Sequence, residues 1–86
     1  MNTRFLLLAE FDGQASIPLV LVAEKYLGIS DPARAKRLAA GNDLPLPAYR
    51  ASGSQKAPWL VHVDDLAELL DKQREAARRE WLALNQ

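Results

Sequence analysis

Apolar residues recur at helical spacing in the first half of the chain. The i, i+3, i+4, i+7, i+8 pattern of one helical face is met by Leu19, Val22, Ala23, Tyr26 and Leu27. Pro18 fits the first turn of this helix and Gly28 fits its end. The segment is therefore predicted to be an amphipathic helix.

A second helix start follows at once. Ser30 or Asp31 can cap it, Pro32 fits its first turn, and Gly41 can close its end. Two short helices joined by a tight turn with a glycine predict a helix-turn-helix over residues 18–41.

The N-terminal segment 4–11 is a short apolar run that ends at Asp12-Gly13. Asp-Gly between two apolar segments is a hairpin signal. We therefore predict an N-terminal hairpin over residues 4–17, formed by segments 4–11 and 14–17. A helical turn over residues 5–10 is the competing interpretation.

Residues 46–63 have the layout of a wing, which is two strands joined by a polar loop. Pro45 and Pro47 rule out a helix around them, because proline lacks the donor N–H and restricts the preceding residue. The β-branched and aromatic segment 59–63 predicts one strand, 48–50 can form the other, and the polar loop 51–57 contains Gly53. Trp59 is predicted to lie in the core.

The last element is predicted to be a helix over residues 64–84, with Asp64 or Asp65 as its cap and Glu68 completing a capping box. Its second half extends past any core that a chain this short can build. We therefore expect a homodimer that pairs through four residues of the apolar stripe, Leu70, Ala77, Trp81 and Leu84.

Together these elements predict an α+β fold, namely a small winged helix-turn-helix domain with a long C-terminal helix. The 86 residues are enough for one hydrophobic core, so residues 1–86 are expected to form a single domain.

The net charge is zero, but the charges are unevenly distributed. Residues 34–56 carry five basic side chains and one acidic side chain, whereas the segments on either side each have an excess of two acidic side chains. A local basic patch can contact phosphates even when the whole chain is neutral. The alternative is chance clustering on a solvated surface.

Candidate DNA contacts follow from this patch and the predicted fold. In the second helix, Lys36 and Arg37 lie opposite the apolar face and would enter the major groove, with Arg34 at its edge. In the wing, the residues suited to the DNA backbone or minor groove are Arg50, Ser54, Gln55 and Lys56. An ordinary surface helix and a flexible loop are the alternatives.

Several classes of chemistry find no support. The chain has no cysteine and one histidine, His62, which we expect to be a hydrogen-bonded structural residue rather than a metal ligand. No phosphate-binding glycine loop or catalytic triad is recognisable, so an enzyme is disfavoured and no cofactor is expected. The apolar run 5–9 is too short for a membrane span or signal peptide, and we expect a cytoplasmic protein.

The run 54–67, which contains Ser54-Gln55-Lys56-Ala57-Pro58-Trp59, resembles the pyocin activator protein family, as do the weaker segments 2–8, 17–19 and 44–47. The resemblance spans about residues 2 to 81 and extends, more loosely, to excisionase-like winged helices. It implies a bacterial or prophage transcriptional activator that binds double-stranded DNA boxes upstream of promoters, without metal or cofactor. RNA polymerase is a further expected partner, and the run 54–59 is suited to touch either the polymerase or DNA.

The predicted function is therefore sequence-specific activation of pyocin or prophage-type genes by a homodimeric winged helix-turn-helix protein. Two alternatives remain open. One is an excisionase-like architectural protein that bends DNA, and the other is a phage or prophage interaction module that acts on a host protein through the last helix.

Overall fold

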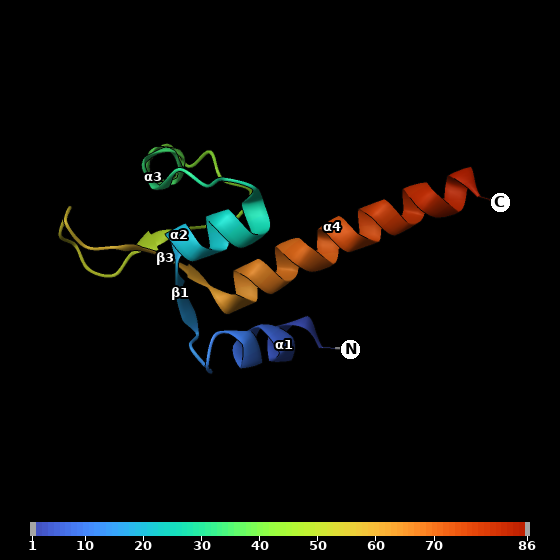
Figure 1. The fold of residues 1–86 in the computed structure, drawn as a ribbon, viewed down its shortest axis with the longest axis horizontal. Coiled ribbons are helices and arrows are strands. Elements are labelled where there is room, and N and C mark those ends of the chain that lie inside the picture. Colours follow the sequence, from blue (N-terminus) through green and yellow to red (C-terminus); the bar gives the residue numbers. More distant parts are fainter. Residues whose placement is uncertain (1, 86) are drawn as a thin grey trace.

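A computed structural model describes residues 2–85 and shows an α+β fold (Figure 1). Its helices are α1 (Thr3–Glu10), α2 (Leu19–Val22), η1 (Ala23–Leu27), α3 (Pro32–Ala40) and α4 (Val63–Leu84). Its strands are β1 (Ser16–Pro18), β2 (Tyr49–Arg50) and β3 (Trp59–His62). The predicted fold class is confirmed, because a long C-terminal helix follows an arrangement compatible with a winged helix. The predicted domain covers residues 1–86, and its first and last residues lie outside the described range.

The three strands form one antiparallel sheet in the order β1-β3-β2. The central strand β3 pairs Val61 with Ile17 of β1 and Trp59 with Arg50 of β2. Ile17 and Val61 are fully buried, so β1, which leads into α2, is packed against β3, which leads into α4.

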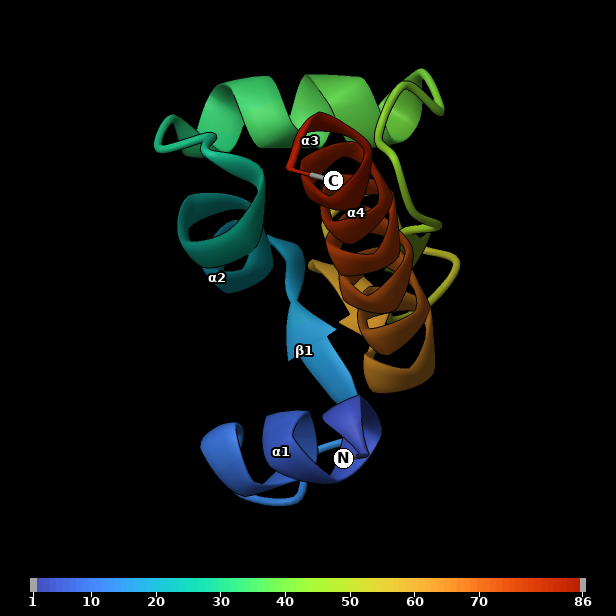
Figure 2. The same cartoon turned by 90° about the vertical axis from the view of Figure 1, so that its right-hand side faces the viewer.

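The helix-turn-helix consists of the continuous helical segment α2–η1, a short turn and α3, which lies across α2 in Figure 2. Gly28 closes η1 with a φ of 70°, a left-handed conformation that glycine adopts without strain. Asp31 caps α3, because its carboxylate accepts a hydrogen bond of 3.0 Å from the backbone N–H of Ala33. Pro32 occupies the first turn, where its missing N–H has no consequence.

The end of α3 differs in one detail from the sequence prediction. Gly41 has an ordinary negative φ, and Asn42 takes the left-handed conformation with a φ of 56°. The backbone N–H of Asp43 then donates to the carbonyl of Leu38 at 2.8 Å. Asparagine tolerates this conformation better than most residues, so the closing turn forms one residue later than expected.

The predicted N-terminal hairpin over residues 4–17 is wrong. Thr3–Glu10 is a helix, the competing interpretation, and segment 14–17 contributes β1, which pairs with β3 instead of with residues 4–11. Asp12 and Gly13 have the positive φ values that a hairpin turn would need, but they end α1. The N–H of Gly13 donates to the carbonyl of Leu8, which is a helix-closing bond. The same dipeptide can therefore close either element.

The hydrophobic core lies between the sheet, α2–η1, α3 and the first half of α4. Its largest fully buried side chains are Ile17, Leu19, Val22, Val61, Val63 and Leu66. Leu7 is the buried residue that α1 contributes, and Leu46 anchors the proline-rich segment between α3 and the wing. This core fixes α3 and the wing relative to each other.

Helix α4 begins at Val63, and its cap is His62 rather than Asp64 or Asp65. The imidazole Nδ1 of His62 accepts a hydrogen bond of 3.0 Å from the N–H of Asp64. His62 thus has the hydrogen-bonded structural role expected for it. The two aspartates lie in the first turn, where negative charge is favourable next to the helix dipole.

Polar contacts hold α1 against α4 and η1. Thr3 donates to Asp71 at 2.5 Å, Arg4 pairs with Asp64 at 2.5 Å, and Glu10 accepts from Tyr26 at 2.5 Å. These contacts are solvent-exposed and each is worth little by itself. Within residues 2–85, none of the helices combines the length and the apolar character that crossing a membrane requires.

Candidate nucleic-acid interface

Helix α3 buries one face and exposes a basic one. Ala35 and Ala39 are buried against the core and Leu38 is partly buried, in agreement with the predicted inward face. Lys36 and Arg37 are exposed on the other side. Since alanines form most of the inward face, α3 lies close to α2 while its long cationic side chains extend outward.

A groove of about 680 Å³ separates this basic face from the wing. Its walls come from three places, the start of α2, the exposed face of α3 and the wing. The lining residues are Pro18, Leu19, Val20, Lys36, Arg37, Ala40, Arg50, Gln55, Lys56, Ala57, Pro58 and Trp59. The fold therefore brings five of the seven predicted DNA-contacting residues to one surface, Lys36, Arg37, Arg50, Gln55 and Lys56.

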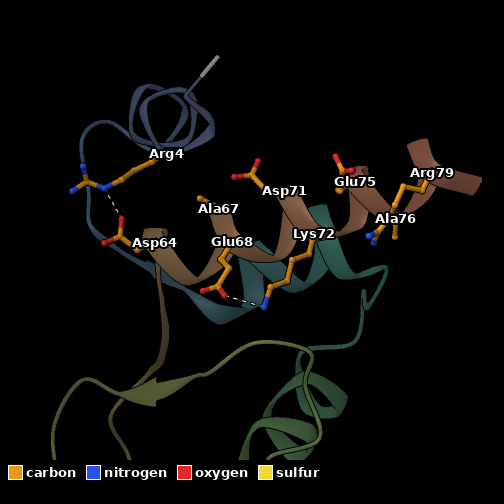
Figure 3. A pocket seen from close by; sticks show the side chains of 9 residues that line it. All are labelled: Arg4, Asp64, Ala67, Glu68, Asp71, Lys72, Glu75, Ala76 and Arg79. Atoms are coloured by element: carbon orange, nitrogen blue, oxygen red, sulfur yellow. Dashed lines mark hydrogen bonds and ion pairs between the residues drawn. The ribbon is translucent and has the colours of Figure 1, made fainter. Parts of the chain in front are cut away.

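The groove is strongly cationic. Four of its lining residues carry a positive charge, and no carboxylate is present among the described residues that line it. By contrast, a second groove of about 740 Å³ between α1 and α4 mixes three basic side chains with four acidic ones, and Glu68 is paired there with Lys72 (Figure 3). Only the first of these two grooves has the charge that an anionic polymer would require.

Arg50 organises the wing as well as contributing charge. Its Nη1 donates to the backbone carbonyls of Gln55 at 2.6 Å and Ala57 at 3.3 Å. Its guanidinium lies over the Trp59 ring, 4.5 Å from the centroid. Arg50 thus joins the loop to β3, which holds Gln55 and Lys56 on the groove side.

The wing loop is further shaped by its own serines. Ser52 accepts from the N–H of Ser54, and Ser54 accepts from the N–H of Lys56 at 3.1 Å. Ser54 is therefore a turn-forming residue outside the groove lining. Arg34 is likewise exposed on α3 but does not line the groove.

Trp59 has a larger part in the groove than strand composition indicates, because that composition predicts it in the core. It is half-buried, with one side packed on the core and the other exposed to the groove beneath Arg50. The pairing of β2 with β3 explains why Trp59 faces the groove. Arg50 and Trp59 are directly opposite each other across β2 and β3, and cross-strand partners share a face.

The groove offers cationic and hydrogen-bonding groups on a partly apolar base, which can bind phosphates and the edges of bases. Within residues 2–85, no three His, Cys, Asp or Glu side chains gather closely enough to hold a metal ion.

Comparison with known proteins places the chain in a family. Searches of curated proteins and of solved structures gave no match. The family model described as pyocin activator protein PrtN matches residues 3–77, which include α1, the helix-turn-helix, the wing and the first two-thirds of α4. The chain therefore belongs to the pyocin activator protein PrtN family.

Proposed function

We propose that this protein is a sequence-specific DNA-binding activator of transcription, which recognises boxes upstream of pyocin or prophage-type genes. The observation that carries the proposal is the groove between α3 and the wing, which collects four cations and contains no carboxylate among its described residues. Family membership supports the activator role.

In this proposal α3 enters the major groove. Lys36 and Arg37 would donate to base edges or phosphates, and Arg34 would approach the backbone at the rim. Ala40 is the small residue of α3 in the groove lining, so it would not obstruct close approach of the duplex. Guanine, whose major-groove edge carries two acceptors, is the base that suits Arg37 best.

The wing would lie along the DNA backbone or in the minor groove. Gln55 and Lys56 are held on the groove side by the contacts of Arg50, so they would meet the duplex without first being ordered. Ser54 would reach the backbone from the outer side of the loop. RNA polymerase is a further proposed partner of an activator, and the exposed residues 51–53 are outside the proposed DNA contacts and could meet it when the groove holds DNA.

The first test is selection from a pool of random duplex DNA, followed by sequencing, at two salt concentrations. Enrichment of one box supports a sequence-specific regulator. A promoter reporter carrying that box then separates an activator, which raises transcription, from an architectural protein, which only bends DNA. Binding without enrichment favours the architectural role, and no binding at either salt contradicts the proposal.

A pair of double variants locates the interface. Lys36→Ala with Arg37→Ala should weaken binding to the selected box by roughly 1 to 3 kcal/mol for each side chain that reads a base edge. The matched control is Lys72→Ala with Arg79→Ala, which removes the same charge from the α1–α4 groove. Equal effects of the two double variants would show that only net charge matters and would remove α3 from the interface.

A further inference from the structure

The second half of α4 extends beyond the rest of the molecule, and every residue from 71 to 85 is exposed. We call residues 71–84 the α4 tail. Trp81 is 61% exposed and Leu84 is 78% exposed. At about 100° per residue, Leu70, Ala77, Trp81 and Leu84 lie on the same side of α4 as the fully buried Leu66. The face that packs on the core thus continues along the tail with nothing against it among the described residues.

We propose that a second copy of this chain covers this apolar stripe, with the two α4 tails packed antiparallel around a two-fold axis at Ala77. The spacing of the stripe is symmetric about that residue, since Leu70 precedes it by seven positions and Leu84 follows it by seven. An antiparallel partner therefore sets Leu70 against Leu84 of the partner subunit, and the small alanines meet at the axis, where the helices come closest.

The antiparallel register also brings a cationic side chain of one subunit next to an aromatic side chain of the other. Arg74 lies three residues before the axis and Trp81 lies four after it, so each Arg74 meets the Trp81 ring of the partner subunit. Cation–π contacts of this kind are favourable, and most so when arginine approaches tryptophan. A parallel pair would instead place each Arg74 beside its own copy, with like charges in the seam.

The position of the core also selects the antiparallel arrangement. The stripe lies on the side of α4 that carries the body of its own subunit, because Leu66 is buried there. A parallel partner would bring its body into that same space. In the antiparallel arrangement the bodies lie at opposite ends, and each tail fills the open space beside the partner's tail.

The pairing leaves the α3–wing groove open. Figure 1 shows α3 and the wing at one end of the long axis and the C-terminal end of α4 at the other. The α1–α4 groove, which Lys72, Glu75 and Arg79 help to line, is open as well, because helical periodicity places these three residues on the side of α4 away from the stripe. The proposal concerns a surface apart from the groove, so it is tested without DNA.

Cysteine cross-linking tests the arrangement, since the chain has no cysteine of its own. Under mild oxidation Ala77→Cys should give a covalent dimer, because the axis brings the two residues within disulfide reach. Leu84→Cys should not, because its two copies lie at opposite ends of the paired tails. Cross-linking of both variants would show a parallel dimer, and cross-linking of neither would contradict the pairing.

Sedimentation equilibrium of four single variants provides the second readout, since each of the substituted residues is exposed and outside the core. Trp81→Ala should weaken dimerisation about tenfold or more, as truncation of a central tryptophan does in interfaces. The control Phe5→Ala removes a similarly exposed aromatic side chain from α1 and should have no effect on dimerisation. Arg74→Ala should weaken the dimer and Arg79→Ala should not. A wild-type chain that stays monomeric at high concentration would overturn the proposal.

Discussion

Arg50 shows how one side chain can join two parts of a candidate site. Its guanidinium lies over the Trp59 ring and donates to two carbonyls of the wing loop. A planar guanidinium can do both at once, whereas the compact ammonium of lysine cannot. The residue therefore supplies positive charge to the groove and also sets the conformation of the loop that presents Gln55 and Lys56.

Ionisation of Tyr26 should lower the stability of the folded protein at alkaline pH. Burial raises the pKa of the Tyr26 phenol above its usual value of 10.0, so the folded state favours the protonated phenol. The stabilisation is complete below the pKa of the unfolded chain and is lost as pH rises toward the higher pKa of the folded state. Urea unfolding from pH 8 upward should show this loss.

The matched variant for that experiment is Tyr26→Phe, which keeps the ring and removes the titrating group. It loses the hydrogen bond to Glu10, so its stability starts lower. Its free energy of unfolding should then fall less steeply above pH 10 than that of the wild type. Parallel curves for the two proteins would mean that Tyr26 does not contribute to the pH dependence.

For single residues, the sequence predicts which face of a helix a side chain occupies better than it predicts which face of a strand a side chain occupies. Helical periodicity correctly places Lys36 and Arg37 on the exposed side of α3, because it determines which side faces the core. Strand composition places Trp59 in the core, because it does not show which face of a strand is covered. The role of Trp59 needs the pairing with Arg50, which depends on the register of a hairpin with a long loop.

Individual elements differ in how far local signals determine them. The helix-turn-helix has a cap at Asp31, a proline at the first turn and a left-handed residue after each helix, and these signals agree with one another. The segment before it has a positive-φ pair at residues 12 and 13 that suits a hairpin and a helix end equally. Its helical state is supported by the cap at Asn2, whose side chain accepts from the N–H of Phe5, and by packing, since Leu7 enters the core and Arg4 contacts α4.

The cap at the start of α4 should contribute measurably to the stability of the protein. His62→Ala removes the acceptor for the N–H of Asp64 and should destabilise the protein by about 1 kcal/mol, as loss of a helix cap does. His62→Asn keeps an acceptor at that position and should retain most of the stability. Thermal unfolding of both variants at pH 8 gives the comparison. Equal losses would show that His62 stabilises the protein through packing in β3 instead.

The error in assigning this cap has a simple physical cause. Aspartate is the better cap by statistics, but β3 leads directly into α4 and Val63 must point into the core. That requirement starts the helix at Val63 and makes the last residue of the strand its cap. Helix starts that follow a strand without a loop are therefore determined by burial more than by capping preference.

The whole molecule is elongated, with extents of 52 × 27 × 19 Å, because the α4 tail continues past the core. The sequence predicts this overhang, since a helix of about 20 residues is longer than the core of so short a chain. The groove itself is not predictable as a cavity. It arises from the relative placement of α2, α3 and the wing, which depends on contacts far apart in the sequence.

The two surfaces have separate roles in the proposed protein. The groove at one end would bind DNA, and the tail at the other end would bind a second copy. An antiparallel dimer would hold its two grooves at opposite ends, further apart than one turn of DNA, roughly 34 Å. Repeated boxes found by selection should then be widely spaced rather than adjacent.

The most direct test of the account is the salt dependence of binding to one selected box, measured for the wild type and for Lys36→Ala with Arg37→Ala. Four groove cations predict a log–log slope of about −4 for each bound chain, and about −2 for the double variant. A slope that is the same in both proteins would contradict the assignment of the α3–wing groove as the DNA-binding surface.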